Sequence, residues 1–208
     1  MKDMISQWHC YDKMWNVMPW YTEPFLWALN SWRLEHQLVF EWGGGWSTLW
    51  FARRGAKVIT MEYHADWVKM IQAEANAAEV AINLACSTDQ EAYINAIMPY
   101  KGQVDIVTVD GSWRSECAVK ALECVRPGGK IILDNAEHAD KIQELLRHHE
   151  HHAYPQLDHP HWRTDYWVIR PRIDPNENTT VASVRKMERQ GVPNGTLPDP
   201  SNGVTVVG

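Results

Sequence analysis

The chain has 208 residues, enough for one well-buried domain and too few for two of ordinary size. Hydrophobic residues make up 45% and charged residues 22%, as in a soluble globular protein, and no stretch approaches the roughly 18 apolar residues of a membrane-spanning helix. A formal net charge of -6 argues against a protein that binds nucleic acid through its phosphates. The four cysteines form no C-x-x-C pair, and no apolar run like that of a signal peptide follows the first residues, so we expect a cytoplasmic protein.

Helical and strand patterns alternate along most of the chain. A first helix is predicted at 22–32, because Thr22-Glu23-Pro24 combines a capping hydroxyl, an acid and a proline, which are typical of a first turn. Short apolar runs predict strands at 38–40, 57–61, 80–84, 104–109, 130–133 and 166–169. Helical patterns lie between them, at 47–54, 66–78, 89–98, 115–125 and 140–149. This alternation predicts an α/β fold, a Rossmann-like doubly wound and mostly parallel sheet of about seven strands with helices on both faces.

The predicted domain organisation is simple. We expect residues 1–171 to form one domain, in which residues 1–35 make a helical cover. Residues 172–208 turn to Pro, Asn, Gly and Thr, with one short helical candidate at 181–190, and are predicted to form an extended arm or lid.

Four acidic residues end four different predicted strands: Glu41, Glu62, Asp110 and Asp134. In an open parallel sheet the carboxyl ends of the strands meet at one edge, where ligands bind. Four like charges at one edge are costly unless a cation or a hydroxyl-rich ligand engages them. The alternative is that each acid only caps the helix that follows it.

A glycine-rich turn follows the first strand. Dinucleotide-binding turns have the pattern G-x-G-x-x-G and hold a pyrophosphate. Here Gly43-x-Gly45 is followed by Thr48 where the third glycine belongs, and Glu41 directly precedes the turn. A carboxylate at this point suits a cationic ligand better than a pyrophosphate, and S-adenosylmethionine carries a sulfonium and an ammonium group. A nicotinamide-dependent oxidoreductase is the alternative.

The segment Glu41-x-Gly43-x-Gly45-x-Ser47 resembles the first motif of class I S-adenosylmethionine-dependent methyltransferases, and the resemblance extends over residues 20–170. It implies that Glu62 holds both ribose hydroxyls and that Asp89 contacts the adenine. The cofactor-binding residues implied by the resemblance are Thr22, Glu41, Gly43, Gly44, Gly45, Ser47, Glu62, Tyr63, Asp89 and Asp110. Trp20-Tyr21-Thr22 and the run from Asp110 to Cys117 resemble a little-characterised bacterial and phage branch of the family.

A metal ion is a second expectation, because the sequence is also partly similar to catechol-type O-methyltransferases. Those enzymes hold a metal on an acid after the fourth strand and an Asp-Asn pair after the fifth, which implies Mg²⁺ on Asp110, Asp134 and Asn135. Trp113 stands where such enzymes carry a lysine. The alternative is that these residues only form hydrogen bonds.

The expected activity is methyl transfer from S-adenosylmethionine to a hydroxyl group of a small molecule or sugar. Asp110 and His138 are the predicted catalytic residues, with His138 as a general base or, alternatively, a plain surface histidine. N-terminal tryptophan and tyrosine side chains are expected to wall the acceptor. No Asn-Pro-Pro-Tyr or Asp-Pro-Pro-Tyr run points to methylation of nucleic-acid bases. A module that binds the cofactor without catalysis is a further alternative.

Overall fold

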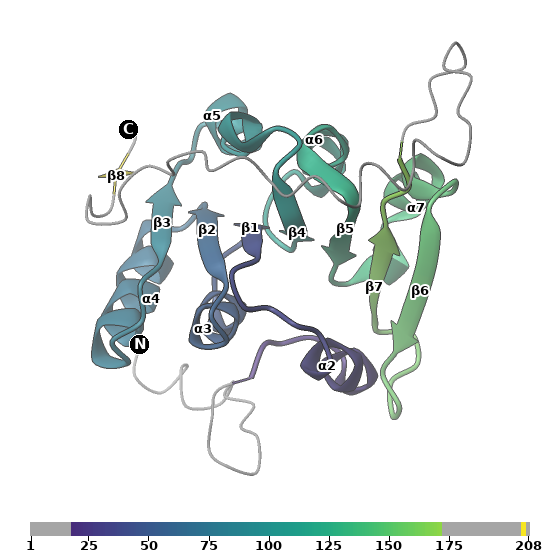
Figure 1. Ribbon diagram of the computed structural model, residues 1–208, viewed down its shortest axis with the longest axis horizontal. Coiled ribbons are helices and arrows are strands. Elements are labelled where there is room, and N and C mark those ends of the chain that lie inside the picture. Colours follow the sequence, from purple (N-terminus) through teal and green to yellow (C-terminus); the bar gives the residue numbers. More distant parts are fainter. Residues whose placement is uncertain (1–17, 172–204, 207–208) are drawn as a thin grey trace.

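The computed structural model describes residues 18–171 and 205–206, and one sheet runs through them (Figure 1). The strand order is β6-β7-β5-β4-β1-β2-β3-β8. The strands are β1 (Leu38–Trp42), β2 (Lys57–Glu62), β3 (Asn83–Cys86), β4 (Val104–Val109), β5 (Val125–Leu133), β6 (Glu150–Pro155), β7 (Arg163–Val168) and the short β8 (Thr205–Val206). Strands β1 to β5 pair in parallel, and β8 pairs in parallel with β3. At the other edge, β7 pairs antiparallel with β5, and β6 pairs antiparallel with β7.

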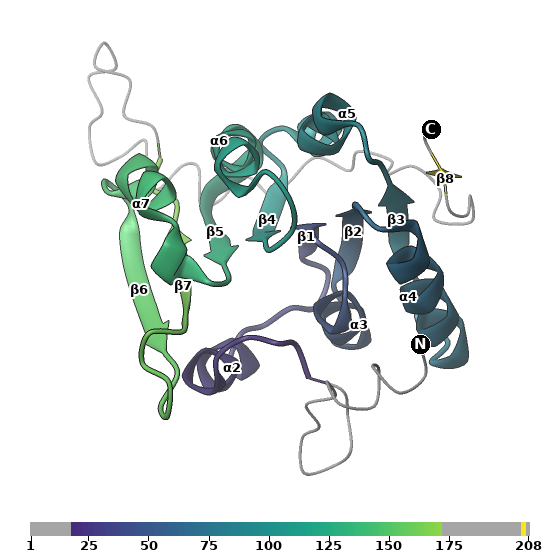
Figure 2. The ribbon, with the colours of Figure 1, turned by 180° about the vertical axis from the view of Figure 1, so that it is seen from behind.

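Helices cover both faces of the sheet, as Figures 1 and 2 show from opposite sides. The helices are α2 (Glu23–Asn30), α3 (Trp46–Arg53), α4 (Ala65–Ala77), α5 (Gln90–Asn95), α6 (Arg114–Cys124) and α7 (Asp140–Leu146), with 3-10 turns η1 (Met98–Tyr100) and η2 (Ala136–His138). Successive strand residues point to opposite faces: Phe40 and Val107 pack on the side of α5, α6 and α7, whereas Val39 and Ile106 pack on the side of α2 and α3. The predicted fold class is therefore confirmed.

The differences from the predicted elements have local causes. The expected helix at 89–98 is divided into α5 and η1 just before Pro99, which cannot donate a backbone hydrogen bond. The expected helix at 140–149 ends at Leu146, and the edge strand β6 follows, which the sequence did not predict. Most residues of β6 are exposed, so its sequence lacks the alternation of apolar and polar residues that predicts a strand. Its aromatic contacts are stacked pairs such as His152 on Tyr166, with ring centroids 4.5 Å apart.

Three predictions fall wholly or partly outside the described residues: the helical candidate at 181–190, nearly all of the expected arm at 172–208, and the first half of the expected helical cover at 1–35. The domain boundaries therefore remain predictions. Among the helices of residues 18–171, none is long and apolar enough to cross a membrane.

Candidate functional site

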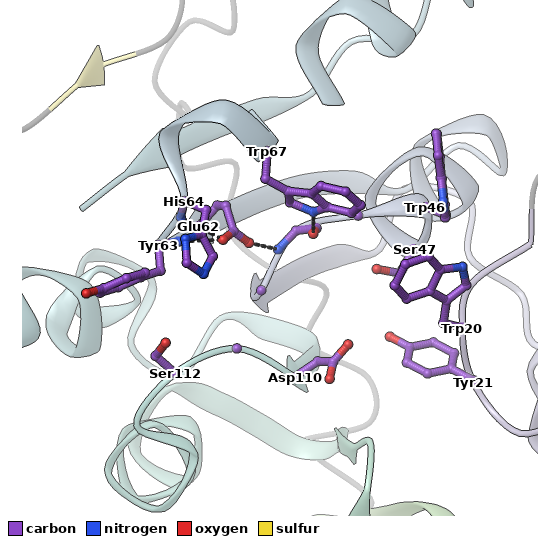
Figure 3. A pocket seen from close by; sticks show the side chains of 14 residues that line it. Trp20, Tyr21, Trp46, Ser47, Glu62, Tyr63, His64, Trp67, Asp110 and Ser112 are labelled. Carbon is purple, nitrogen blue, oxygen red and sulfur yellow. Dashed lines mark hydrogen bonds between the residues drawn. The ribbon is translucent and has the colours of Figure 1, made fainter. Parts of the chain in front are cut away.

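A pocket of about 380 Å³ opens where the strand order reverses, between β1 and β4 (Figure 3). The chain proceeds from β1 to β2 on one side, and β4 lies on the other side of β1, so the helices that follow β1 and β4, α3 and α6, lie on opposite faces of the sheet. The pocket is lined by the glycine turn, the ends of β2 and β4, and several aromatic side chains: Trp20, Tyr21, Gly43, Gly44, Gly45, Trp46, Ser47, Glu62, Tyr63, His64, Trp67, Asp110, Gly111 and Ser112.

The glycine turn brings the loops after β1 and β4 into backbone contact. Gly43 has φ +88°, and a Cβ there would lie 2.6 Å from the backbone nitrogen of Gly111, so no side chain fits. A Cβ on Gly45 would meet only the Trp67 ring, at 3.9 Å. Thr48, which stands where a dinucleotide motif has its third glycine, accepts a hydrogen bond on Oγ1 from Gly45 N at 3.0 Å. This turn is therefore closed by a threonine hydroxyl.

Glu62 ends β2 and is held by three backbone amides. Its Oε2 accepts from Gly44 N, and its Oε1 accepts from Tyr63 N and His64 N, each at 2.8 Å. The side chain is only 5% exposed, and it lines the pocket beside the glycine turn. A carboxylate offers about four lone-pair positions, so a further position remains to accept from a ligand hydroxyl.

Glu41 lies fully buried beneath the glycine turn and does not line the pocket. Its two register partners, Thr60 on β2 and Thr108 on β4, point their hydroxyls at it. Thr60 Oγ1 donates to Oε2 at 3.0 Å, and Thr108 Oγ1 donates to Oε1 at 3.4 Å. Burial raises the pKa of Glu41 to about 6, and neighbouring hydroxyls, that of Thr48 first, limit the rise. A positive charge in the pocket would favour the ionised form.

Arg114, in the first turn of α6, links the ends of β4 and β5. Its Nη2 donates to the carboxylate and the carbonyl of Asp110 at 2.9 and 2.6 Å. Its Nη1 donates to the carbonyl of Asp134 at 2.6 Å and to Asn135 Oδ1 at 3.4 Å. Burial and then the charge of Asp134 raise the pKa of Asp110, whereas Arg114 opposes the rise. The guanidinium thus supplies positive charge between the two strand ends.

The three residues predicted to hold Mg²⁺ do not fit that ion. Asp110 and Asn135 are hydrogen-bonded to Arg114, and Asp134 Oδ1 accepts from Thr164 Oγ1 at 2.6 Å. No group of three or more His, Cys, Asp or Glu side chains within residues 18–171 is arranged to hold a metal. The metal hypothesis is therefore unsupported, because Arg114 engages Asp110 Oδ1 and Asn135 Oδ1, and Thr164 engages Asp134 Oδ1.

Three other predicted site residues lie outside the pocket lining. Thr22 uses its hydroxyl to donate to the Tyr154 carbonyl at 2.8 Å, which ties the start of α2 to β6. Asp89 caps α5, since its Oδ1 accepts from Ala92 N at 2.8 Å. His138 is 84% exposed in its side chain and lies beside Glu137. The remaining expected cofactor residues, apart from Glu41, do line the pocket: Gly43, Gly44, Gly45, Ser47, Glu62, Tyr63 and Asp110.

Five residues of the pocket lining were not predicted, and Trp20 and Tyr21 were expected only as unspecified wall residues. The five are Trp46, His64, Trp67, Gly111 and Ser112. Trp67 Nε1 donates to the carbonyl of Gly44, and the Trp20 ring centroid lies 6.1 Å from that of Trp67. A signal for His64 and Trp67 was available, because residues in the first turn after a strand lie at the ligand-binding edge of such a sheet. Trp20 reaches the pocket from a distant part of the chain, which no local pattern reveals.

Comparison with known protein families finds no match, and no curated protein matches the sequence. Solved structures do match. A methyltransferase-like protein from Silicibacter pomeroyi is 18% identical with a TM-score of 0.55, over 83% of this chain and 95% of that one. An S-adenosylmethionine-dependent O-methyltransferase from Thermotoga maritima is 12% identical with a TM-score of 0.56, over 83% of this chain and 71% of that one.

A third solved structure is a 16S rRNA N2 G1207 methyltransferase from T. thermophilus in complex with AdoMet and guanosine. It is 17% identical with a TM-score of 0.52, over 71% of this chain and 43% of that one. At these identities the likeness establishes the fold, which is that of class I S-adenosylmethionine-dependent methyltransferases. The resemblance expected from the sequence is confirmed at that level.

Proposed function

We propose that the protein is an S-adenosylmethionine-dependent methyltransferase that acts on a hydroxyl group of a small molecule or sugar. The observation that carries the proposal is the convergence of Glu62, Asp110 and the buried Glu41 around one glycine turn at the switch point of the sheet. Burial keeps the charge of Glu41 poorly solvated, so a cationic ligand is favoured there over an anionic one. The methyltransferase fold of the solved structures gives independent support.

In this proposal the cofactor lies along the carboxyl edge of the sheet. Glu62 accepts from the ribose hydroxyls, with its orientation fixed by the three backbone amides. The methionine part passes over Gly43–Gly45, where side chains are absent, and its positive groups lie near Asp110. We also assign the adenine contact to the second carboxylate oxygen of Asp89, because Oδ1 is used by the helix cap.

Methyl transfer is an in-line displacement. The acceptor oxygen bonds to the methyl carbon, the carbon–sulfur bond breaks, and its electron pair stays on sulfur. We assign acceptance of the hydroxyl proton to Asp110, which lines the pocket and whose raised pKa makes it a stronger base than an ordinary carboxylate. His138 is not assigned this role, because it is exposed and lies outside the pocket lining. We place the reaction in the cytoplasm, in keeping with the free thiols of Cys86, Cys117 and Cys124.

The test is transfer of radiolabelled methyl from S-adenosylmethionine to a library of hydroxylated small molecules. We expect a labelled product together with stoichiometric S-adenosylhomocysteine, and we expect the Asp110→Asn variant to lose transfer while it binds the cofactor more weakly but still measurably. Binding of the cofactor without transfer to any acceptor would instead favour a non-catalytic binding module. Failure to bind the cofactor would contradict the proposal itself.

A further inference from the structure

The hydroxyl group of Tyr21 is buried without a hydrogen-bond partner. The side chain is 7% exposed, and its Oη makes no hydrogen bond among the described residues; the neighbouring hydroxyl of Thr108, which lowers the pKa of Tyr21, already donates to Glu41. The ring is fixed from behind, because it packs edge-on against Phe25 of α2, with ring centroids 5.3 Å apart. Buried hydroxyl groups are nearly always hydrogen-bonded in native proteins, so an unpaired one calls for a partner that is not part of the chain.

Tyr21 points its hydroxyl into the pocket. Figure 3 shows the oxygen directed from the aromatic wall toward the carboxylate of Asp110, with the hydroxyl of Ser47 on the same side. Burial, and next the negative charges of Glu41 and Asp110, raise the pKa of Tyr21 well above its ordinary value. The group is therefore a neutral hydrogen-bond donor at physiological pH, opposite a carboxylate that accepts.

The surroundings of this pair restrict what it can bind. The ring of Trp20, which is 46% exposed, lies at the same end of the pocket as Tyr21, and flat rings stack well on such a side chain. Within the described part of the chain, no lysine or arginine lines the pocket. An acceptor with a phosphate or carboxylate would meet Asp110 and Glu62 with no lysine or arginine in the lining to bind it, because Arg114 lies outside the lining and is already paired with Asp110.

We propose that Tyr21 and Asp110 together form the acceptor subsite, which takes an uncharged, hydroxylated ring compound and rejects anionic ones. This inference rests on the proposed function and deepens it. Tyr21 Oη donates to the acceptor oxygen, while the acceptor hydroxyl donates to Asp110. As the oxygen–methyl bond forms and the carbon–sulfur bond breaks, the proton passes to Asp110 and the electron pair remains on sulfur. Tyr21 is thus a specificity-determining residue, because its hydroxyl donates a hydrogen bond only to an acceptor that carries an oxygen at this position.

The experiment is a ligand-observed NMR titration of the full chain saturated with S-adenosylhomocysteine. Three probes are used: phenol, toluene, which lacks the hydroxyl, and phenyl phosphate, which is anionic. The variant is Tyr21→Phe, which removes only the oxygen. The matched control is Tyr93→Phe, because Tyr93 has a buried and equally unpaired hydroxyl that lies outside the pocket lining.

We expect the wild type to bind phenol and not phenyl phosphate. Tyr21→Phe should weaken phenol binding by about five- to tenfold, as for one lost hydrogen bond, and leave toluene binding unchanged. Tyr93→Phe should leave all three affinities unchanged. Equal phenol affinities in the wild type and Tyr21→Phe would overturn the inference, as would binding of phenyl phosphate as tight as that of phenol. If S-adenosylhomocysteine itself does not bind, the proposed function fails instead, so the two failures are distinguishable.

Discussion

The guanidinium of Arg114 lies 2.9 Å from the carboxylate of Asp110, four residues earlier in the chain, in the loop between β4 and α6. The same guanidinium also donates to the carbonyl of Asp134, at the end of the neighbouring strand β5. One side chain therefore closes the gap between two strand ends and balances two acids. At this place catechol-type enzymes would hold a metal ion, whereas this protein has an arginine. Two of the predictions below depend on that arginine.

Replacing Arg114 should weaken the fold. In Arg114→Gln the carbonyls of Asp110 and Asp134 lose a charged donor, and the two carboxylates repel one another without compensation. We expect the free energy of unfolding to fall by about 1–3 kcal/mol, measured by urea denaturation, a range reduced because Arg114 is partly exposed. The control is Lys69→Gln, which removes an exposed ion pair with Asp66 and should cost less than about 0.5 kcal/mol. Equal effects of the two substitutions would contradict the bridging role.

Removal of metal ions should change neither the stability of the protein nor its methyl transfer. Because Arg114 engages oxygens of Asp110 and Asn135 and Thr164 engages one of Asp134, we expect no heat of Mg²⁺ binding in calorimetry and no change in melting temperature after treatment with EDTA. Transfer of the methyl group should be equally insensitive. Loss of transfer on chelation, with recovery on addition of Mg²⁺, would show that a metal is required after all.

The glycine turn should tolerate a methyl group at one position and not at another. Gly43→Ala places a Cβ 2.6 Å from the Gly111 backbone at a positive φ, so the loops after β1 and β4 must move apart. We expect a loss of stability of at least about 2 kcal/mol and a large loss of cofactor affinity. Gly45→Ala meets only ordinary contact with Trp67 and should cost less than about 1 kcal/mol of stability. Thermal unfolding of both variants tests the contrast, and the reverse order would refute the geometry.

Cofactor affinity should depend on pH through Glu41. In the free protein its pKa is raised from 4.5 to about 6, so its protonated form stabilises the fold below pH 4.5 and this contribution is lost as the pH rises through about 6. A sulfonium ligand favours the ionised form, and its affinity should therefore fall as the pH drops through about 6. The titration of one group can change the cofactor affinity by at most about tenfold per pH unit.

Calorimetric titrations from about pH 5 to about pH 8 measure this dependence. Glu41→Gln keeps the shape of the side chain and should give a weaker affinity with a flatter profile. A wild-type affinity that does not change with pH, or the same slope in both proteins, would exclude Glu41 as the responsible group.

The parts of the fold that the sequence predicted are those governed by local patterns. The buried parallel strands are continuous apolar runs, and the acids at their ends identify the ligand-binding edge of the sheet. The edge strand β6 was missed because its exposed residues carry no apolar alternation. The role of Arg114 was missed because its contacts depend on the tertiary proximity of the ends of β4 and β5, which no local pattern in the sequence reveals. The unpaired hydroxyl group of Tyr21 likewise becomes evident only in the folded chain, where the ring packs against α2.

The most direct test of the central claim is calorimetric titration with S-adenosylmethionine and, separately, with NADH. We predict binding of one S-adenosylmethionine per chain, no tight binding of NADH, and a loss of about 1–3 kcal/mol of binding free energy in Glu62→Ala. Tight binding of NADH with none of S-adenosylmethionine would contradict the methyltransferase assignment. An unchanged affinity in Glu62→Ala would show that the ribose does not lie where we place it.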